Sequence, residues 1–61
     1  MSNLNLLELQ NVRHLVGAHE TIANKLEDYA NQCTDQQIVN MLKADAQSAK
    51  TGKQNLLTFL N

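Results

Sequence analysis

The sequence predicts an all-α fold, an antiparallel helical hairpin of two long helices that dimerises into a four-helix bundle. The 61 residues contain no proline, two glycines and only two aromatic side chains, a composition that suits helices better than a multi-stranded sheet. Apolar side chains recur every three or four residues through most of the chain. A short polar segment near the middle interrupts this pattern, so we expect one domain over residues 1–61 with two helical halves.

The first helix is expected over residues of about 5–32. A first row of positions, spaced alternately by four and three residues, is mostly apolar, and a second row lies beside it at a spacing of seven. The first row is Glu8, Val12, Leu15, His19, Ile22, Leu26, Tyr29 and Cys33, and the second is Leu9, Val16, Ala23 and Ala30. We expect the first row to face the other helix of the hairpin, which leaves the second row for a partner.

The turn is expected at about 33–34. Thr34 and Gln37 have the spacing of a capping box, Cys33 and Ile38 are placed as a hydrophobic staple, and Asp35 suits the positive end of a helix dipole. The second helix is then expected at about 35–60, where the same two rows recur. They are Ile38, Leu42, Asp45, Ala49, Gly52, Leu56 and Phe59, flanked by Val39, Ala46, Lys53 and Leu60.

The width of the apolar face predicts a homodimer. A single hairpin covers only part of a face this wide, whereas two hairpins bury all of it, and two-fold symmetry is the commonest arrangement. The single cysteine cannot form an intrachain disulfide, which is one of the usual ways to stabilise so small a domain. Whether it ever joins two chains depends on an oxidising environment.

Composition also excludes several classes of function. A net charge of −1 provides no basic field for nucleic acid, which makes a nucleic-acid partner improbable. No run of consecutive apolar residues exceeds two, so we expect neither a membrane span nor a membrane partner. We therefore expect a cytoplasmic protein.

Polar residues within the apolar rows are the only candidates for chemistry. Counting outward from the turn, we expect His19 near Ser48 and Ala49, and Asp45 near Ile22, within about one helical turn of His19. His19 and Asp45 then form either a buried polar layer that fixes the register of the bundle or a ligand-binding, metal-binding or proton-transfer site. No Glu-x-x-His pair of the kind used by di-metal bundles is present. We assign no catalytic, cofactor-binding or metal-binding residue and expect a protein that is not an enzyme.

The open end of the hairpin is apolar around nearly its whole circumference. Leu6, Leu7 and Leu57 fall outside the two rows. They either cap the bundle or form an interaction end that contacts another protein.

The layout resembles the Coat F family of spore coat proteins. The similarity lies in Tyr29-Ala30, Cys33, Asp35, Ile38 and Leu42, and in the segment 56–60 at the C-terminal end of the second helix. The resemblance implies a degenerate ferritin-like helical pair and an association with spores, and it carries over no functional residue.

These observations lead to one main expectation and two alternatives. The first is a non-enzymatic structural or interaction protein, a homodimeric four-helix bundle that is spore-associated if the family resemblance holds. The first alternative is a small RNA-binding or regulatory bundle, although Arg13 and Lys25 do not form a cationic stripe on the first helix. The second alternative is a ligand- or metal-binding bundle centred on His19 and Asp45.

Overall fold

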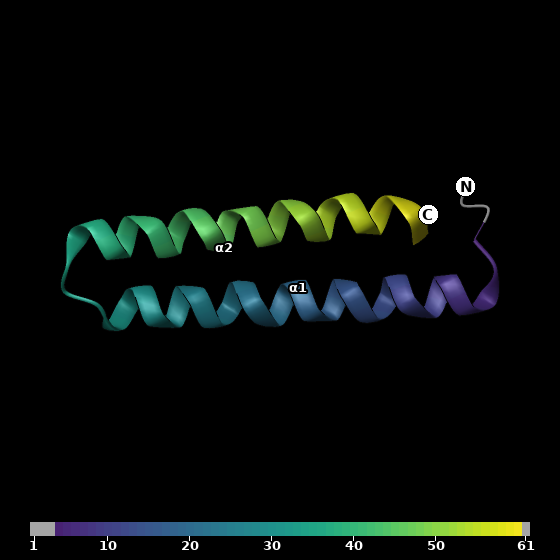
Figure 1. Cartoon of the computed structure of the whole chain (residues 1–61), viewed down its shortest axis with the longest axis horizontal. Coiled ribbons are helices and arrows are strands. Elements are labelled where there is room, and N and C mark those ends of the chain that lie inside the picture. Colours follow the sequence, from purple (N-terminus) through teal and green to yellow (C-terminus); the bar gives the residue numbers. More distant parts are fainter. Residues whose placement is uncertain (1–3, 61) are drawn as a thin grey trace.

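The structure is a computed structural model that describes residues 4–60. It consists of two α-helices, α1 (Leu6–Gln32) and α2 (Gln36–Leu57), and a final 3-10 turn, η1 (Thr58–Leu60). The helices lie side by side in opposite directions, with the turn at one end and the start of α1 beside the end of α2 at the other (Figure 1). The described residues contain no strand, and the predicted all-α helical hairpin is confirmed.

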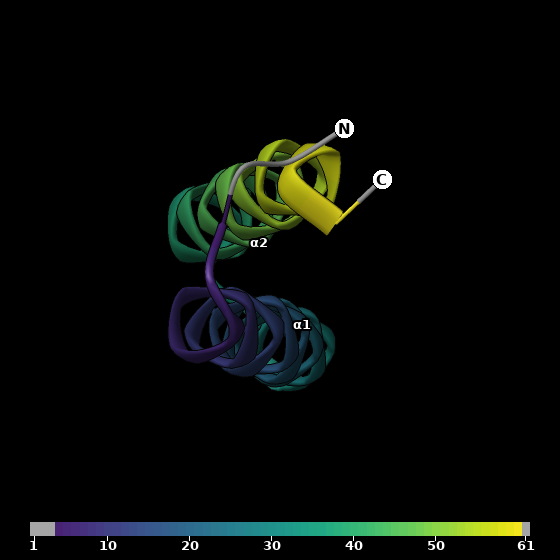
Figure 2. The ribbon, with the colours of Figure 1, turned by 90° about the vertical axis from the view of Figure 1, so that its right-hand side faces the viewer.

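The hairpin is long and thin, with principal extents of 45 × 14 × 11 Å. Seen from its end, the described part of the chain is a single layer of two helices (Figure 2). Each helix can therefore bury only the strip of its surface that faces the other helix.

Helix α1 begins with a capping box. The backbone N–H of Glu8 donates to Oδ1 of Asn5 at 2.9 Å, and the backbone N–H of Asn5 donates to Oε1 of Glu8 at 3.2 Å. These two bonds satisfy donors that a helix N-terminus otherwise leaves unpaired, and the carboxylate favours the positive end of the helix dipole. Glu8 thus belongs to the cap rather than to the interface between the helices.

The turn differs from the predicted one in its cap. Asp35, not Thr34, is the N-cap of α2, and its Oδ1 accepts hydrogen bonds from the backbone N–H groups of Gln37 at 2.9 Å and Ile38 at 3.3 Å. The predicted capping box of Thr34 and Gln37 is wrong. A carboxylate at the N-cap accepts both bonds and adds a negative charge at the positive end of the dipole, which a threonine hydroxyl does not provide.

The interface between the helices is built on alanine. The buried side chains are Ala23 and Ala30 of α1 and Val39 and Ala46 of α2. All four belong to the second rows, which were expected to remain for a partner, so that expectation is wrong. Small side chains allow two helices to pack closely, which accounts for the alanine rows facing inward.

Half of each first row lies beside the alanines and is half-buried in the same interface. These residues are Val12, His19, Leu26 and Cys33 of α1 and Leu42, Ala49 and Leu56 of α2. The remaining first-row positions from Leu15 onward are exposed, apart from the half-buried Gly52, and they form an apolar surface beside the interface.

Candidate functional site

The exposed half of the first rows forms one apolar surface. We call it the open face and define it by Leu15, Ile22 and Tyr29 of α1, by Ile38, Asp45 and the half-buried Gly52 of α2, and by Phe59 of η1. Its large side chains are 45–54% exposed although their positions continue the apolar pattern of the interface. Met41, at 65% exposure, extends this surface beside Ile38. A spacing of seven residues keeps each row on one side of its helix.

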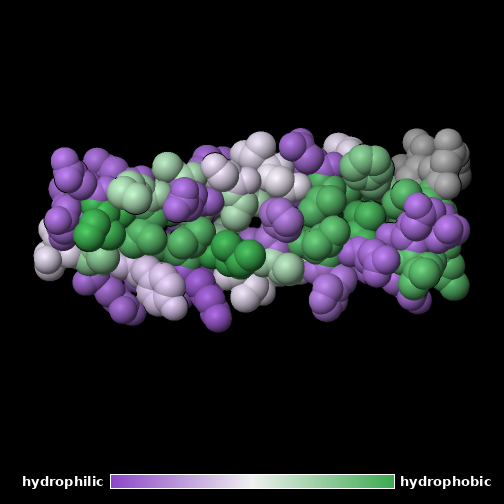
Figure 3. Space-filling view, in the orientation of Figure 1, coloured by the Kyte–Doolittle hydropathy of each residue, from purple (hydrophilic) through white to green (hydrophobic). Residues whose placement is uncertain are grey.

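The open face runs along most of the hairpin. In an antiparallel helix pair the rows that flank the interface on the same side adjoin each other, so the α1 and α2 parts of the open face form one strip. Figure 3 shows apolar side chains in a broken band along the middle of one face, over both helices, with hydrophilic side chains at the two edges. An exposed apolar band of this kind is a candidate interaction surface in a small protein.

The opposite edge of the interface is polar and carries two ion pairs. Lys50 Nζ lies 2.5 Å from Glu27 Oε1, and Lys53 Nζ lies 3.7 Å from Glu20 Oε2. Shallow hollows along this edge are lined by these four side chains and by neighbouring alanine, asparagine and glutamine residues. Exposed pairs of this kind each contribute at most about 1 kcal/mol. Their main consequence is that the negative charges of two glutamates on α1 offset the positive charges of two lysines on α2.

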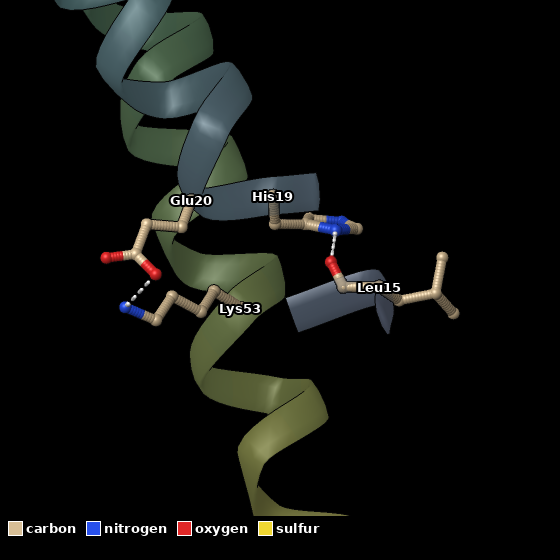
Figure 4. A network of polar contacts seen from close by, with 4 residues as sticks. All are labelled: Leu15, His19, Glu20 and Lys53. Atoms are coloured by element: carbon tan, nitrogen blue, oxygen red, sulfur yellow. Dashed lines mark hydrogen bonds and ion pairs between the residues drawn. The ribbon is translucent and has the colours of Figure 1, made fainter. Parts of the chain in front are cut away.

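His19 packs against Gly52 at the boundary between the interface and the open face. Its Nδ1–H donates to the carbonyl oxygen of Leu15 at 2.8 Å, which fixes the ring (Figure 4). The ring lies so close to α2 that a Cβ atom on Gly52 would be 2.8 Å from Cδ2 and 3.0 Å from Nε2 of His19. Figure 4 also shows that Glu20, the next residue, points to the other side of α1, where it meets Lys53. Gly52 is therefore the glycine that makes room for the histidine.

His19 and Asp45 make no hydrogen bond or ion pair with each other in the described chain. His19 lies against Gly52, one helical turn beyond Ser48 and Ala49, near which it was expected. Gly52 is seven residues beyond Asp45 on α2, a rise of about 10 Å. Counting from the turn gives backbone levels, whereas side chains lean toward the N-terminus of their own helix. In an antiparallel pair these opposite tilts make each α1 side chain meet a residue further along α2 than the backbone levels suggest.

Asp45 is exposed, and it makes no hydrogen bond or ion pair with any described residue. It is the one charged side chain of the open face. Any partner that covers the open face must therefore deal with this carboxylate.

The open end carries the most exposed leucines of the described chain. Leu6 is 70% and Leu7 67% exposed, whereas Leu57 is partly covered. Of the three residues predicted for an interaction end, Leu6 and Leu7 therefore offer the most free apolar surface.

Two features were missed by the sequence reasoning. The capping box of Asn5 and Glu8 has the ordinary spacing of such a motif and could have been found. The contact of His19 with Gly52 could not, because it depends on which row each helix turns inward.

Residues 4–60 contain neither a cluster of metal ligands nor a helix that could span a membrane. Within residues 4–60 no three histidine, cysteine, aspartate or glutamate side chains lie close enough together to hold a metal ion. Neither helix has the length and apolarity needed to cross a membrane. No protein-family model, curated protein or solved structure matches the chain.

Proposed function

We propose that this protein is a non-enzymatic structural or interaction protein and that its working form is a homodimeric four-helix bundle in which two hairpins pack through their open faces. The observation that carries the proposal is the regular row of half-exposed Leu15, Ile22, Tyr29, Ile38 and Phe59 along one side of the hairpin. Burying such a side chain fully contributes about 1.5–3 kcal/mol relative to full exposure. Since these side chains are already about half covered, completing their burial supplies about half of that for each of them.

The accessible surface of the chain supports the same conclusion. It is 4711 Å², whereas a compact monomer of 6.8 kDa has a surface of about 4,000 Å². The excess of about 700 Å² is close to the roughly 800 Å² that each partner buries in a stable interface of standard size. The hairpin therefore has about one interface more surface than a self-sufficient domain of its mass.

The small core explains why the chain needs a partner. The buried side chains are three alanines and one valine, and among the described residues no large side chain is fully buried. Domains of this size with so thin a core usually depend on oligomerisation, a metal or disulfides.

A second copy suits the open face better than an unrelated helix. The apolar positions of the open face recur at the heptad spacing of the hairpin itself, so another hairpin of the same chain matches the face in length and in spacing. With a net charge of −1 per chain, two copies also repel each other only weakly.

The test is a pair of charge substitutions on neighbouring residues of α1. Ile22→Glu places a carboxylate in the middle of the open face, and Thr21→Glu places the same group at an exposed position outside it. Light scattering at micromolar concentration is expected to give twice the chain mass of 6.8 kDa for the unmodified protein and for Thr21→Glu. Ile22→Glu is expected to give the mass of one chain, with reduced helicity.

Two outcomes would contradict the proposal. One is an unmodified chain that is monomeric and fully helical under these conditions. The other is a dimer that both substitutions leave intact, which would place the interface elsewhere, with the exposed Leu6 and Leu7 as the next candidates.

The resemblance to Coat F proteins supports a role for this dimer in spores, after synthesis in the cytoplasm. Leu6, Leu7 and Leu57 at the open end would then contact another protein of the assembly. Immunodetection of the protein in purified spores and in the soluble cell fraction tests this assignment. Its absence from spores would remove the spore role and leave the dimer unaffected.

A further inference from the structure

We propose that the two hairpins of the dimer lie with their turns at the same end, so that α1 of each copy packs on α2 of the other. In this arrangement the Tyr29 hydroxyl of one copy donates a hydrogen bond to the Asp45 carboxylate of the other. The inference rests on the proposed dimer and specifies how the second copy binds.

The contacts within the hairpin show which residues of the open face lie at the same level. Three contacts place the side chains of α1 against α2: His19 with Gly52, Glu20 with Lys53 and Glu27 with Lys50, whose residue numbers add up to 71, 73 and 77. Ile22 and Gly52, whose numbers add up to 74, fall within this range, so we treat these two positions as level. One heptad toward the open end lie Leu15 and Phe59, and one heptad toward the turn lie Tyr29 and Asp45. From the open end toward the turn, the pairs of positions at the same level are therefore Leu15 with Phe59, Ile22 with Gly52, and Tyr29 with Asp45.

Two-fold symmetry allows two ways to pack one open face on another. If the axis runs along the helices, both turns lie at the same end, and α1 lies over the α2 of the other copy at an unchanged level. If the axis runs across the helices, the turns lie at opposite ends, with α1 over α1 and α2 over α2. The axis along the helices permits no sliding, so the levels seen within one hairpin also apply between the two copies.

Asp45 distinguishes the two arrangements. The part of the open face that α2 and η1 provide consists of Ile38, Asp45, Gly52 and Phe59, none of which has a side-chain hydrogen-bond donor. Packing α2 on α2 would bury the carboxylate without a donor from the facing helix, which is costly. Packing α2 on α1 places it level with Tyr29, whose hydroxyl is the one such donor on the open face of α1.

Both groups are available for this bond. Tyr29 is 54% exposed, Asp45 is exposed, and neither makes a hydrogen bond to a described residue of its own chain. A tyrosine that becomes buried usually finds a partner for its hydroxyl group, and a carboxylate forms a stronger bond than a neutral acceptor.

The other two levels fit the same arrangement. Leu15 meets Phe59 of the second copy, an apolar contact at the open-end side. Ile22 meets Gly52 of the second copy, where a large side chain is opposite a residue that has none. Each level therefore combines residues that can be buried together.

The native Cys33 provides a direct test, because it is the only cysteine and lies at the turn. A nitroxide attached to Cys33 gives one label per chain, and pulsed dipolar spectroscopy measures the distance between the two labels of a dimer. With the turns at one end we expect a separation of about 20 Å, two helix diameters. With the turns at opposite ends the labels would be separated by nearly the hairpin length of 45 Å.

The outcomes separate the two proposals. A long distance would overturn the same-end arrangement and leave the dimer standing, whereas the absence of any dipolar signal in a monomeric sample would overturn both. Because Cys33 is half-buried, the measurement is repeated with Cys33→Ser/Thr34→Cys, which moves the label to an exposed position of the same turn. The two labels must agree on the arrangement.

The hydrogen bond between Tyr29 and Asp45 is tested by a double-mutant cycle, which measures the energetic coupling of the two side chains. Tyr29→Phe leaves the facing carboxylate without a donor, and we expect it to raise the dissociation constant of the dimer at least tenfold. In an Asp45→Leu background the carboxylate is gone, so Tyr29→Phe is expected to change the dissociation constant less than threefold. An equal effect of Tyr29→Phe in both backgrounds would refute the bond, even if the spectroscopy supports the arrangement of the turns.

Discussion

Gly52→Ala is the substitution whose effect depends most directly on the geometry described here. In a helix interior alanine is more favourable than glycine by about 1 kcal/mol, so the change should stabilise the protein if space were available. The new Cβ would instead lie 2.8 Å from Cδ2 of the His19 ring. The ring cannot move away freely, because its Nδ1–H is bonded to the carbonyl oxygen of Leu15.

The magnitude follows from these opposing terms. Overpacking of this kind costs about 1–3 kcal/mol, and loss of the His19 hydrogen bond adds about 1 kcal/mol if the ring rotates. Set against the gain in helix propensity, Gly52→Ala is expected to lower the free energy of unfolding by about 1–2 kcal/mol. The measurement is urea unfolding followed by circular dichroism at one fixed chain concentration.

Gly17 provides the matched control. It also lies inside a helix, but a Cβ at this position would meet nothing within 4 Å. Gly17→Ala is therefore expected to raise the free energy of unfolding by about 0.5–1 kcal/mol. In a His19→Ala background the obstruction is absent, and Gly52→Ala should become stabilising as well. If Gly52→Ala stabilised the unmodified protein as much as Gly17→Ala does, the His19 contact would be refuted.

Three further predictions concern the caps, the open face and the polar edge, each measured as a change in unfolding free energy or melting temperature. Asn5→Ala and Asp35→Ala should each cost about 1 kcal/mol, and no loss would contradict the caps. Asp45→Leu should leave the melting temperature unchanged or raise it, because a buried polar pair adds little stability; a large decrease would reveal an essential partner. Glu27→Gln should change stability by less than about 1 kcal/mol, since its pair with Lys50 is exposed.

The hairpin itself could be predicted from the sequence because heptad spacing and the break at residues 33–35 are local signals. The rotation of each helix about its own axis could not be predicted. Both rows of α1 are apolar, and the choice between them depends on how closely the two axes approach. Ala23, Ala30 and Ala46 permit the close approach, and this turns Ile22 and Tyr29 outward. Spacing alone places all of these residues on one wide face.

The contact of His19 with Gly52 has a related origin. His19 and Asp45 do lie on the apolar rows, as the sequence indicates, but the tilt of the side chains shifts the contacts along α2 by about one turn. His19 consequently meets Gly52, whereas Asp45 makes no hydrogen bond or ion pair with a described residue. Counting residues from the turn gives the level of each backbone position and takes no account of this tilt.

The central claim is that one chain is half of a folded unit, and the concentration dependence of thermal unfolding tests it most directly. For a dimer that unfolds to two separate chains, a roughly hundredfold increase in chain concentration adds about 2.7 kcal/mol to the free energy of unfolding. For a dimer of this size we expect the melting temperature to rise by about 10 °C. A melting temperature that stays constant over this range, with the mass of a single chain throughout, would contradict the claim.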